Sequence, residues 1–166
     1  MRRVLLLLMA VALMSAGRPI EFERVKEEAA REGKLIVIRF TGSDWCRPCK
    51  IMDRKVFAND TFVHFADSNL IVIEADFPKN KPQDEETRRQ NKMLSRKYQK
   101  SVSYPYTVLV DAQGTLLSAW RGYGGQPAAD YIAEISGYLP EKIPVQPDVE
   151  VKSSISVSMD TTESGQ

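Results

Sequence analysis

The sequence predicts an α/β domain in which helices flank a mixed central sheet of four to five strands. Three observations favour this class. A strand, a helical region and a second strand follow one another in the first half, which is the pattern of parallel strand pairing. Two further β-rich runs lie on either side of the short sequence DAQG, which predicts an antiparallel hairpin. Helical patterns precede, separate and follow these strands.

The composition is that of one globular domain. The chain has 166 residues, of which 43% are hydrophobic and 27% are charged, and this length is enough for a sizeable core. The formal net charge is +1. We therefore expect no nucleic-acid partner, because such a partner calls for a strong and clustered basic excess.

Residues 1–17 have the pattern of a signal peptide. The basic MRR precedes an apolar run of eleven residues, VLLLLMAVALM, and the small residues SAG follow it. The apolar run is well short of the about 20 residues that a membrane span needs. We expect cleavage after Gly17 and export to a compartment, such as the periplasm, where disulfides persist. An uncleaved N-terminal membrane anchor is the alternative.

In the first half of the domain, a helix and a strand precede the cysteines. Apolar residues of EFERVKEEAAREGKL recur at helical spacing, and Gly33 provides a stop signal. LIVIRF (residues 35–40) is a β-rich run that predicts a buried strand. TGSD predicts a turn, in which Asp44 is a candidate cap for a helix from about residue 46 to residue 56. Pro48 is tolerated in the first turn of that helix.

Helices and strands continue to alternate after this region. NDTFVHFAD predicts a short helix capped by Asn59 or Asp60, and NLIVIEADF predicts a second buried strand. ETRRQNKMLSRKYQK predicts a largely solvated helix with Met93, Leu94 and Tyr98 on its apolar stripe. PYTVLV and TLLSAW form the predicted hairpin, and PAADYIAEISGYL predicts a last helix.

The character of the chain changes after residue 140. Residues 141–166 are rich in Ser, Thr and Pro and show no helical period, so we expect a disordered tail. The domain itself should span residues 18–140. The alternative is that part of the tail forms a strand on a partner, because apolar residues alternate at Val149, Val151, Ile155 and Val157.

Both cysteines of the chain, Cys46 and Cys49, lie in FTGSDWCRPCK, and three interpretations of the pair are open. Structural zinc needs four ligands, and the chain offers two cysteines and one histidine, His64, so we expect no metal. A static disulfide that closes so small a loop would remove little chain entropy from the unfolded state. A redox pair has a physical mechanism, since this spacing at a strand-to-helix junction is typical of redox sites.

The two cysteines should differ in role. Cys46 would start the helix, where unpaired N–H groups and the helix dipole favour a thiolate. Arg47 and Lys50 add positive charge nearby, so Cys46 should be the attacking thiol. Cys49 lies about one turn further along and is expected to be more buried. From there it would attack a mixed disulfide formed on Cys46.

These residues resemble the thioredoxin family. DWCRPCK resembles its active site, with Trp45 before the first cysteine and Pro48 before the second. SYPYTVLVDAQG resembles the cis-proline segment, and RGYGG resembles the turn before the last helix. The resemblance covers roughly residues 22–139 and implies a thioredoxin fold. It also implies that the Tyr104–Pro105 bond is cis, that Pro105 packs against the disulfide, and that Tyr104 pairs with substrate backbone.

More narrowly, FTGSDWC, VFANDTFVHF and EADFPKNKP resemble exported bacterial thioredoxin-like proteins, in the style of the C-terminal domain of the disulfide interchange protein DsbD. Two departures stand out. IRFTGSDWC has one more residue between strand and cysteine than ordinary thioredoxin. Arg39 stands about where the family has a buried aspartate that assists proton transfer to the second cysteine. Glu74 is a candidate base, and a plain exposed or salt-bridged glutamate is the alternative.

The resemblance implies a thiol–disulfide oxidoreductase that exchanges disulfides with protein partners outside the cytoplasm. Cys46 would attack and Cys49 would resolve, while Trp45, Tyr104 and Pro105 would line the docking groove. No cofactor is expected beyond the thiols. An upstream electron donor, such as a membrane thiol carrier, is expected.

Two residues between the cysteines favour opposite directions of electron flow. Pro48 resembles the reducing members of the family. Arg47 stabilises the thiolate, hence the reduced form, and so favours an oxidant. We expect a reductase. The alternative is an exported binding or scaffold module that uses the same groove with little turnover.

Overall fold

The computed structural model describes residues 21–139, so the expected signal peptide and tail lie outside the described residues. The elements along the chain are α2 (Glu21–Glu32), β1 (Leu35–Thr41), α3 (Arg47–Met52), the π-helical segment η2 (Asp53–Phe57), α4 (Asp60–Asn69), β2 (Leu70–Asp76), α5 (Glu85–Tyr98), β3 (Tyr106–Val110), β4 (Leu116–Arg121) and α6 (Ala128–Ser136). This order is the predicted one. Among the described helices, none is long and apolar enough to cross a membrane.

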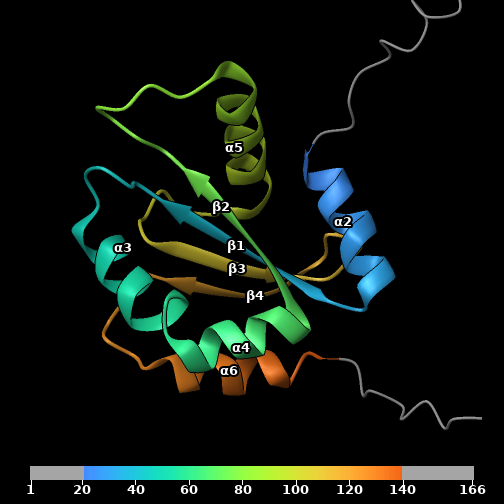
Figure 1. Ribbon diagram of the computed structural model, residues 1–166. Helices are drawn as coiled ribbons and strands as arrows, with labels where there is room; N and C mark the ends of the chain where they lie inside the picture. Colours follow the sequence, from blue (N-terminus) through green and yellow to red (C-terminus); the bar gives the residue numbers. More distant parts are fainter. Residues whose placement is uncertain (1–20, 140–166) are drawn as a thin grey trace, which may run out of the picture.

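The four described strands form one mixed sheet in the order β2-β1-β3-β4. β1 and β2 are parallel, as predicted, and their register begins with Leu35 opposite Leu70. β3 runs antiparallel to both β1 and β4, which confirms the predicted hairpin. Because the first two strands are parallel, their carboxyl ends meet at the same edge of the sheet, next to the start of α3 (Figure 1).

Helices cover both faces of the sheet, and β1 feeds a separate core on each face. Side chains alternate along a strand, so Ile36, Ile38 and Phe40 pack in the core beneath α2 and α5. Leu35 and Val37 pack in the opposite core, beneath η2, α4 and α6. Figure 1 shows these two helical layers with the sheet between them. Burial on both faces explains why LIVIRF is nearly continuous in apolar residues.

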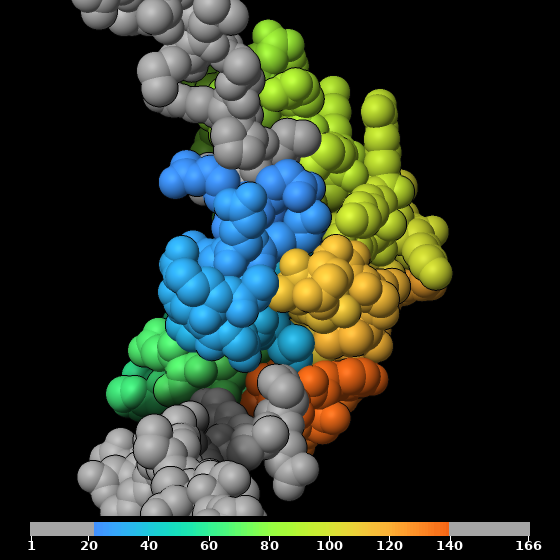
Figure 2. Space-filling model, turned by 90° about the vertical axis from the view of Figure 1, so that its right-hand side faces the viewer, coloured from blue at the N-terminus to red at the C-terminus, as the bar shows by residue number. Residues whose placement is uncertain are grey.

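α2 packs with its predicted apolar stripe inward, since Phe22, Val25 and Ala29 are buried. Figure 2 views the molecule from this side and shows α2 flanked by α5 and by the turn between β3 and β4. The buried Tyr98 at the end of α5 donates its hydroxyl to the carbonyl of Gly114 in that turn at 2.8 Å. Gly114 has a φ of 81°, a conformation that glycine adopts without strain.

The helix predicted for residues 46–56 is present but has two parts. α3 passes into η2, where the N–H of Ala58 donates to the carbonyl of Asp53, five residues back. The expected cap is wrong, because Cys46 is the N-cap residue of α3 and Asp44 lies elsewhere. For α4, the cap is Asn59, whose side chain accepts the N–H of Thr61.

The stripe of α5 differs in one residue from the prediction. Leu94 and Tyr98 are buried, whereas Met93 is only partly so. The buried residue that the pattern missed is Asn91, whose side-chain amide donates to the carbonyl of Asp76 at 2.8 Å. A polar side chain can be buried there because its amide has this partner at the end of β2.

Candidate active site

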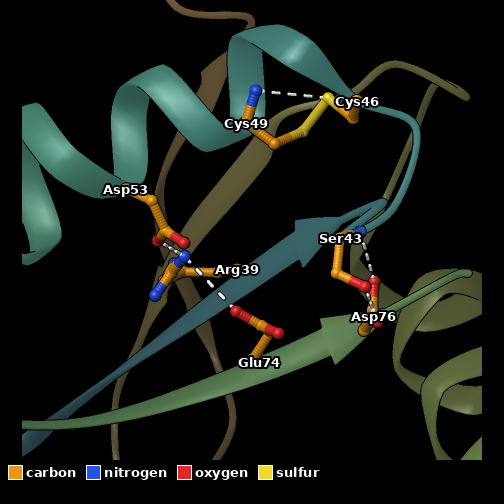
Figure 3. A network of polar contacts seen from close by, with 7 residues as sticks. All are labelled: Arg39, Ser43, Cys46, Cys49, Asp53, Glu74 and Asp76. Carbon is orange, nitrogen blue, oxygen red and sulfur yellow. Dashed lines mark hydrogen bonds and ion pairs between the residues drawn. A yellow bond between two sulfur atoms is a disulfide. The ribbon is translucent and has the colours of Figure 1, made fainter.

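Cys46 and Cys49 form a disulfide at the start of α3, with their Cα atoms 5.3 Å apart (Figure 3). The Sγ atom of Cys46 accepts the backbone N–H of Cys49 at 3.2 Å, as an N-cap side chain does. Cys46 is 3% exposed and Cys49 is 5% exposed. The expectation that Cys49 is the more buried residue is therefore wrong for the oxidised form, because the disulfide ties both side chains to the domain.

The backbone before α3 fixes the position of Cys46. The N–H of Cys46 donates to the carbonyl of Gly42 at 2.8 Å and closes a tight turn. Pro48 lies in the first turn of the helix, as predicted. Arg47 and Lys50 are exposed, and Nζ of Lys50 donates to the carbonyl of Asp44 at 3.1 Å. Positive charge therefore gathers around the helix start.

The segment opposite the disulfide contains the cis peptide bond that the resemblance implies, between Tyr104 and Pro105. Pro105 is buried and lines the same small cavity as Cys49. Tyr104 is only partly buried. Burial raises the pKa of the Tyr104 hydroxyl, while a hydrogen bond with Gln99 opposes that effect.

Three aromatic rings form a cluster beside the cysteines, which we call the aromatic cluster: Trp45, Phe77 and Tyr104. The rings of Trp45 and Tyr104 meet edge to face with centroids 5.2 Å apart, and Phe77 lies 5.8 Å from Tyr104. Nε1 of Trp45 donates to the carbonyl of Phe77 at 2.8 Å. Nζ of Lys79 lies 4.2 Å above the Trp45 ring. The indole is therefore held on several sides.

Two aspartates hold the loop before Cys46 to the loop after β2. Asp76 accepts the backbone N–H of Ser43 at 2.8 Å and its hydroxyl at 2.6 Å (Figure 3). The carboxylate of Asp44 accepts the backbone N–H groups of Lys79 and Asn80. Burial raises the pKa of Asp44, but these N–H donors outweigh that effect and lower it below its usual range. Asp44 thus stabilises the second loop instead of capping α3.

Asp76 and Phe77 contribute to the site although neither was predicted as a site residue. Their signal was present, because both stand at the carboxyl end of the second predicted strand. In a parallel pair this end meets the carboxyl end of the first strand, which leads to Cys46.

A partly buried cation lies beneath the helix that carries the cysteines. Arg39 of β1 has a side chain that is 16% exposed, and it forms ion pairs with Asp53 of η2 and, at 3.3 Å, with Glu74 of β2. Its guanidinium carbon lies 4.1 Å from the centroid of the Phe57 ring. Burial lowers the pKa of Arg39, whereas the negative charge of Glu74 raises it. The guanidinium stays charged at neutral pH.

The sequence left Glu74 as either a candidate base for Cys49 or an exposed or salt-bridged glutamate. The ion pair with Arg39 favours the second interpretation. Asp53 was missed in the sequence analysis, although its place one helical turn after Cys49 was a usable signal. His64 is exposed on α4. Over residues 21–139, no group of three or more His, Cys, Asp or Glu side chains is arranged to hold a metal ion.

Comparison with known proteins agrees with this geometry. A family model described as Thioredoxin-like matches residues 18–112. The chain belongs to the thioredoxin-like family. Its sequence is 35% identical over 113 residues to the disulfide bond reductase DsbH of Chlamydia pneumoniae, covering 68% of this chain and 67% of that protein. It is 32% identical over 76 residues to the thioredoxin-related protein DsbJ of the same organism, but covers only 22% of it.

Solved structures show the same fold. The structure titled DsbH Oxidoreductase superposes with a TM-score of 0.64 at 33% identity, covering 69% of this chain and 78% of that one. The oxidised C-terminal domain of DsbD from Neisseria meningitidis has a TM-score of 0.50 at 18% identity, covering 77% of this chain and 94% of that one. The similarity to the DsbD domain supports the fold alone.

The family, the DsbH likeness and the Cys46–Cys49 disulfide together identify a thiol–disulfide oxidoreductase. This confirms the fold class and the type of activity that the sequence resemblance implied.

Proposed function

We propose that this protein is an exported reductase of protein disulfides, in which Cys46 attacks the substrate and Cys49 releases it. The observation that carries the assignment of roles is the N-cap position of Cys46. Its sulfur already accepts an N–H of the first helical turn, and a thiolate there would keep that donor. Cys49 lies within α3 and is not at the N-cap position.

The reaction balances in two steps. The Cys46 thiolate attacks one sulfur of a substrate disulfide, forms a mixed disulfide and expels the other sulfur as a thiolate. The Cys49 thiol then loses its proton and attacks the Sγ of Cys46. This closes the Cys46–Cys49 disulfide and releases the remaining substrate sulfur. Two electrons pass from the protein dithiol to the substrate, whose released thiolates take up protons.

The groove for the substrate would be lined by Trp45, Tyr104 and Pro105. Trp45 and Tyr104 belong to the aromatic cluster, and Pro105 borders the cavity next to Cys49. Large rings with a polar edge are favoured at protein–protein contacts, since they bury much area and lose little side-chain entropy. Arg47, Pro48 and Lys50 would tune the thiolate of Cys46 from the helix start.

The reducing direction is supported by Pro48 between the cysteines and by the likeness to a protein named as a disulfide bond reductase. We expect a potential of about −270 mV for the Cys46–Cys49 pair at pH 7, near that of thioredoxin, rather than the roughly −120 mV of DsbA. Equilibration in dithiothreitol redox buffers, with thioredoxin measured alongside, determines this value. A potential near the oxidising end would reverse the direction. Failure to reduce insulin with dithiothreitol as donor would instead favour the binding module.

Export is proposed from the order of basic, apolar and small residues over residues 1–17. A reductase outside the cytoplasm needs electrons from across the membrane, so a membrane thiol carrier is the proposed donor. The mature protein should begin at Arg18. Intact-mass analysis of protein from the extracytoplasmic fraction checks this. A mass that retains MRRVLLLL would support a membrane anchor instead.

A further inference from the structure

A small cavity of about 10 Å³ lies next to Cys49, between the helix and the sheet. This volume is about that of one water molecule. Arg39 is the charged side chain among the described residues that line the cavity, which are Arg39, Phe40, Thr41, Cys49, Met52, Phe57, Pro105 and Thr107. Arg39 and Cys49 therefore border the same small space between the helix and the sheet.

The guanidinium of Arg39 is held in this place from three sides. Figure 3 shows Asp53 reaching down to Arg39 from the helical run that carries Cys49, and Glu74 reaching up from the neighbouring strand. Arg39 and Glu74 are direct partners in the β1–β2 register. The ring of Phe57 lies against the guanidinium. These contacts hold the cation beneath the helix.

The three charges of this cluster do not act equally on the cavity. The side chain of Arg39 is 16% exposed, whereas those of Asp53 and Glu74 are 47% and 44% exposed. Water screens the two carboxylates more than it screens the less exposed cation. Neither carboxylate residue is among those that line the cavity, so the field on the Cys49 side is expected to be positive.

We propose that Arg39 is a positioning residue that stabilises the thiolate of Cys49 and so speeds the release of the substrate. The proposal uses the thiol–disulfide exchange of the family and the resolving role of Cys49 proposed above, and it holds for either direction of electron flow. A buried thiolate without a partner would be strongly disfavoured. A cation from a residue that borders the same cavity as Cys49 offsets that penalty, so the thiol does not need a buried base to accept its proton.

The chemistry of the step is the second half of the exchange. Cys49 gives its proton to solvent water, and the thiolate that forms attacks the Sγ of Cys46 and expels the substrate sulfur. The expelled thiolate takes up a proton, so protons balance over the step. The groups that act on Cys49 are Arg39 from β1, Asp53 from η2, Glu74 from β2, and Cys46, Arg47 and Lys50 around the helix start. From the cis-proline segment and β3, the cavity receives only the uncharged Pro105 and Thr107.

A two-phase reaction with 5,5′-dithiobis(2-nitrobenzoate) measures the step directly. Cys46 of the reduced protein attacks the reagent and releases one coloured thiolate. Cys49 then resolves the adduct and releases a second. Arg39→Met should slow the second phase by about tenfold at pH 7 and move the midpoint of its pH–rate profile up by about one pH unit. The first phase should change by less than about twofold, because the cation lies on the Cys49 side.

Three further variants separate charge from structure. Arg39→Lys keeps the charge and should restore most of the second-phase rate. Arg54→Met removes the same charge from an exposed position of η2, and both phases should stay as in the wild type. Glu74→Gln removes a carboxylate that opposes the cation, and should quicken the second phase. Circular dichroism and Tm show whether each variant folds.

An unchanged second phase in Arg39→Met, or an equal slowing of both phases, would overturn the role of Arg39 and leave the roles of the cysteines intact. Absence of a second phase in the wild type would remove the resolving role of Cys49, and this proposal with it. If Arg39→Met does not fold, Glu74→Gln decides. A faster second phase then supports the proposal, and an unchanged or slower one overturns it.

Discussion

Cys49→Ser is expected to accumulate mixed disulfides with protein substrates, whereas Cys46→Ser should trap almost none. The reason lies in the order of the two attacks. With Cys46 intact at the helix start, the first exchange still occurs, but a serine hydroxyl cannot expel the bound sulfur. With Cys46 replaced, the attacking thiolate is absent. In both variants, multiple-turnover reduction of insulin should fall close to the uncatalysed rate.

Non-reducing electrophoresis and mass spectrometry of the purified variants measure this difference. Adducts should disappear on addition of dithiothreitol, and the double variant Cys46→Ser/Cys49→Ser is the matched control for non-covalent binding. Equal trapping by both single variants would contradict the assigned order of attack. Trapping by neither variant, with slow alkylation of both thiols, would favour a binding module over an enzyme.

Gly42→Ala is expected to disturb the site from a position that carries no chemistry. A Cβ atom at Gly42 would lie 2.6 Å from Cζ2 and 2.5 Å from Nε1 of Trp45, so the indole must move. Its hydrogen bond to Phe77 and its contact with Tyr104 depend on the present position. Overpacking of this kind costs about 1–3 kcal/mol of stability. Reduction of protein disulfides should fall by roughly ten- to a hundredfold, since the docking surface is displaced.

Thermal unfolding and insulin reduction check this prediction, and Gly124→Ala provides the matched control. A Cβ at Gly124 would meet only the flexible end of the Gln126 side chain, at 3.2 Å, so stability and rate should barely change. The double variant Gly42→Ala/Trp45→Ala removes the clash, and its stability should match that of Trp45→Ala alone. A Gly42→Ala protein with wild-type Tm and turnover would show that the loop accommodates the methyl group freely.

Much of the scaffold could be predicted because local patterns determine it. LIVIRF is apolar on both faces of a strand, and the structure buries both faces. The Cys46–Cys49 spacing at a strand-to-helix junction predicted a redox pair, and family comparison and structure agree. The cis bond before Pro105 was different in kind. Composition and spacing contain no signal for it, and only the resemblance to a family implied it.

The predictions that proved wrong concern side chains whose partners come from distant segments of the chain. Asp44 precedes a helix and looked like its cap, but its carboxylate accepts N–H groups 35 and 36 residues further along the chain. Cys46 took the cap position instead, because its sulfur reaches the N–H of Cys49. The relative burial of the cysteines was also wrong, since the disulfide ties both side chains to the domain.

The sequence by itself determined the α/β layout with helices flanking a mixed sheet, the position of the cysteine pair and the type of chemistry, because apolar runs, helical spacing and a four-residue motif are local properties. Only the tertiary structure decided what surrounds the pair. The parallel register of β1 and β2 places Glu74 beside Arg39, and the helical turn after Cys49 brings Asp53 to the same cation. Pairing between segments far apart in the chain creates this environment, and no local pattern records such pairing.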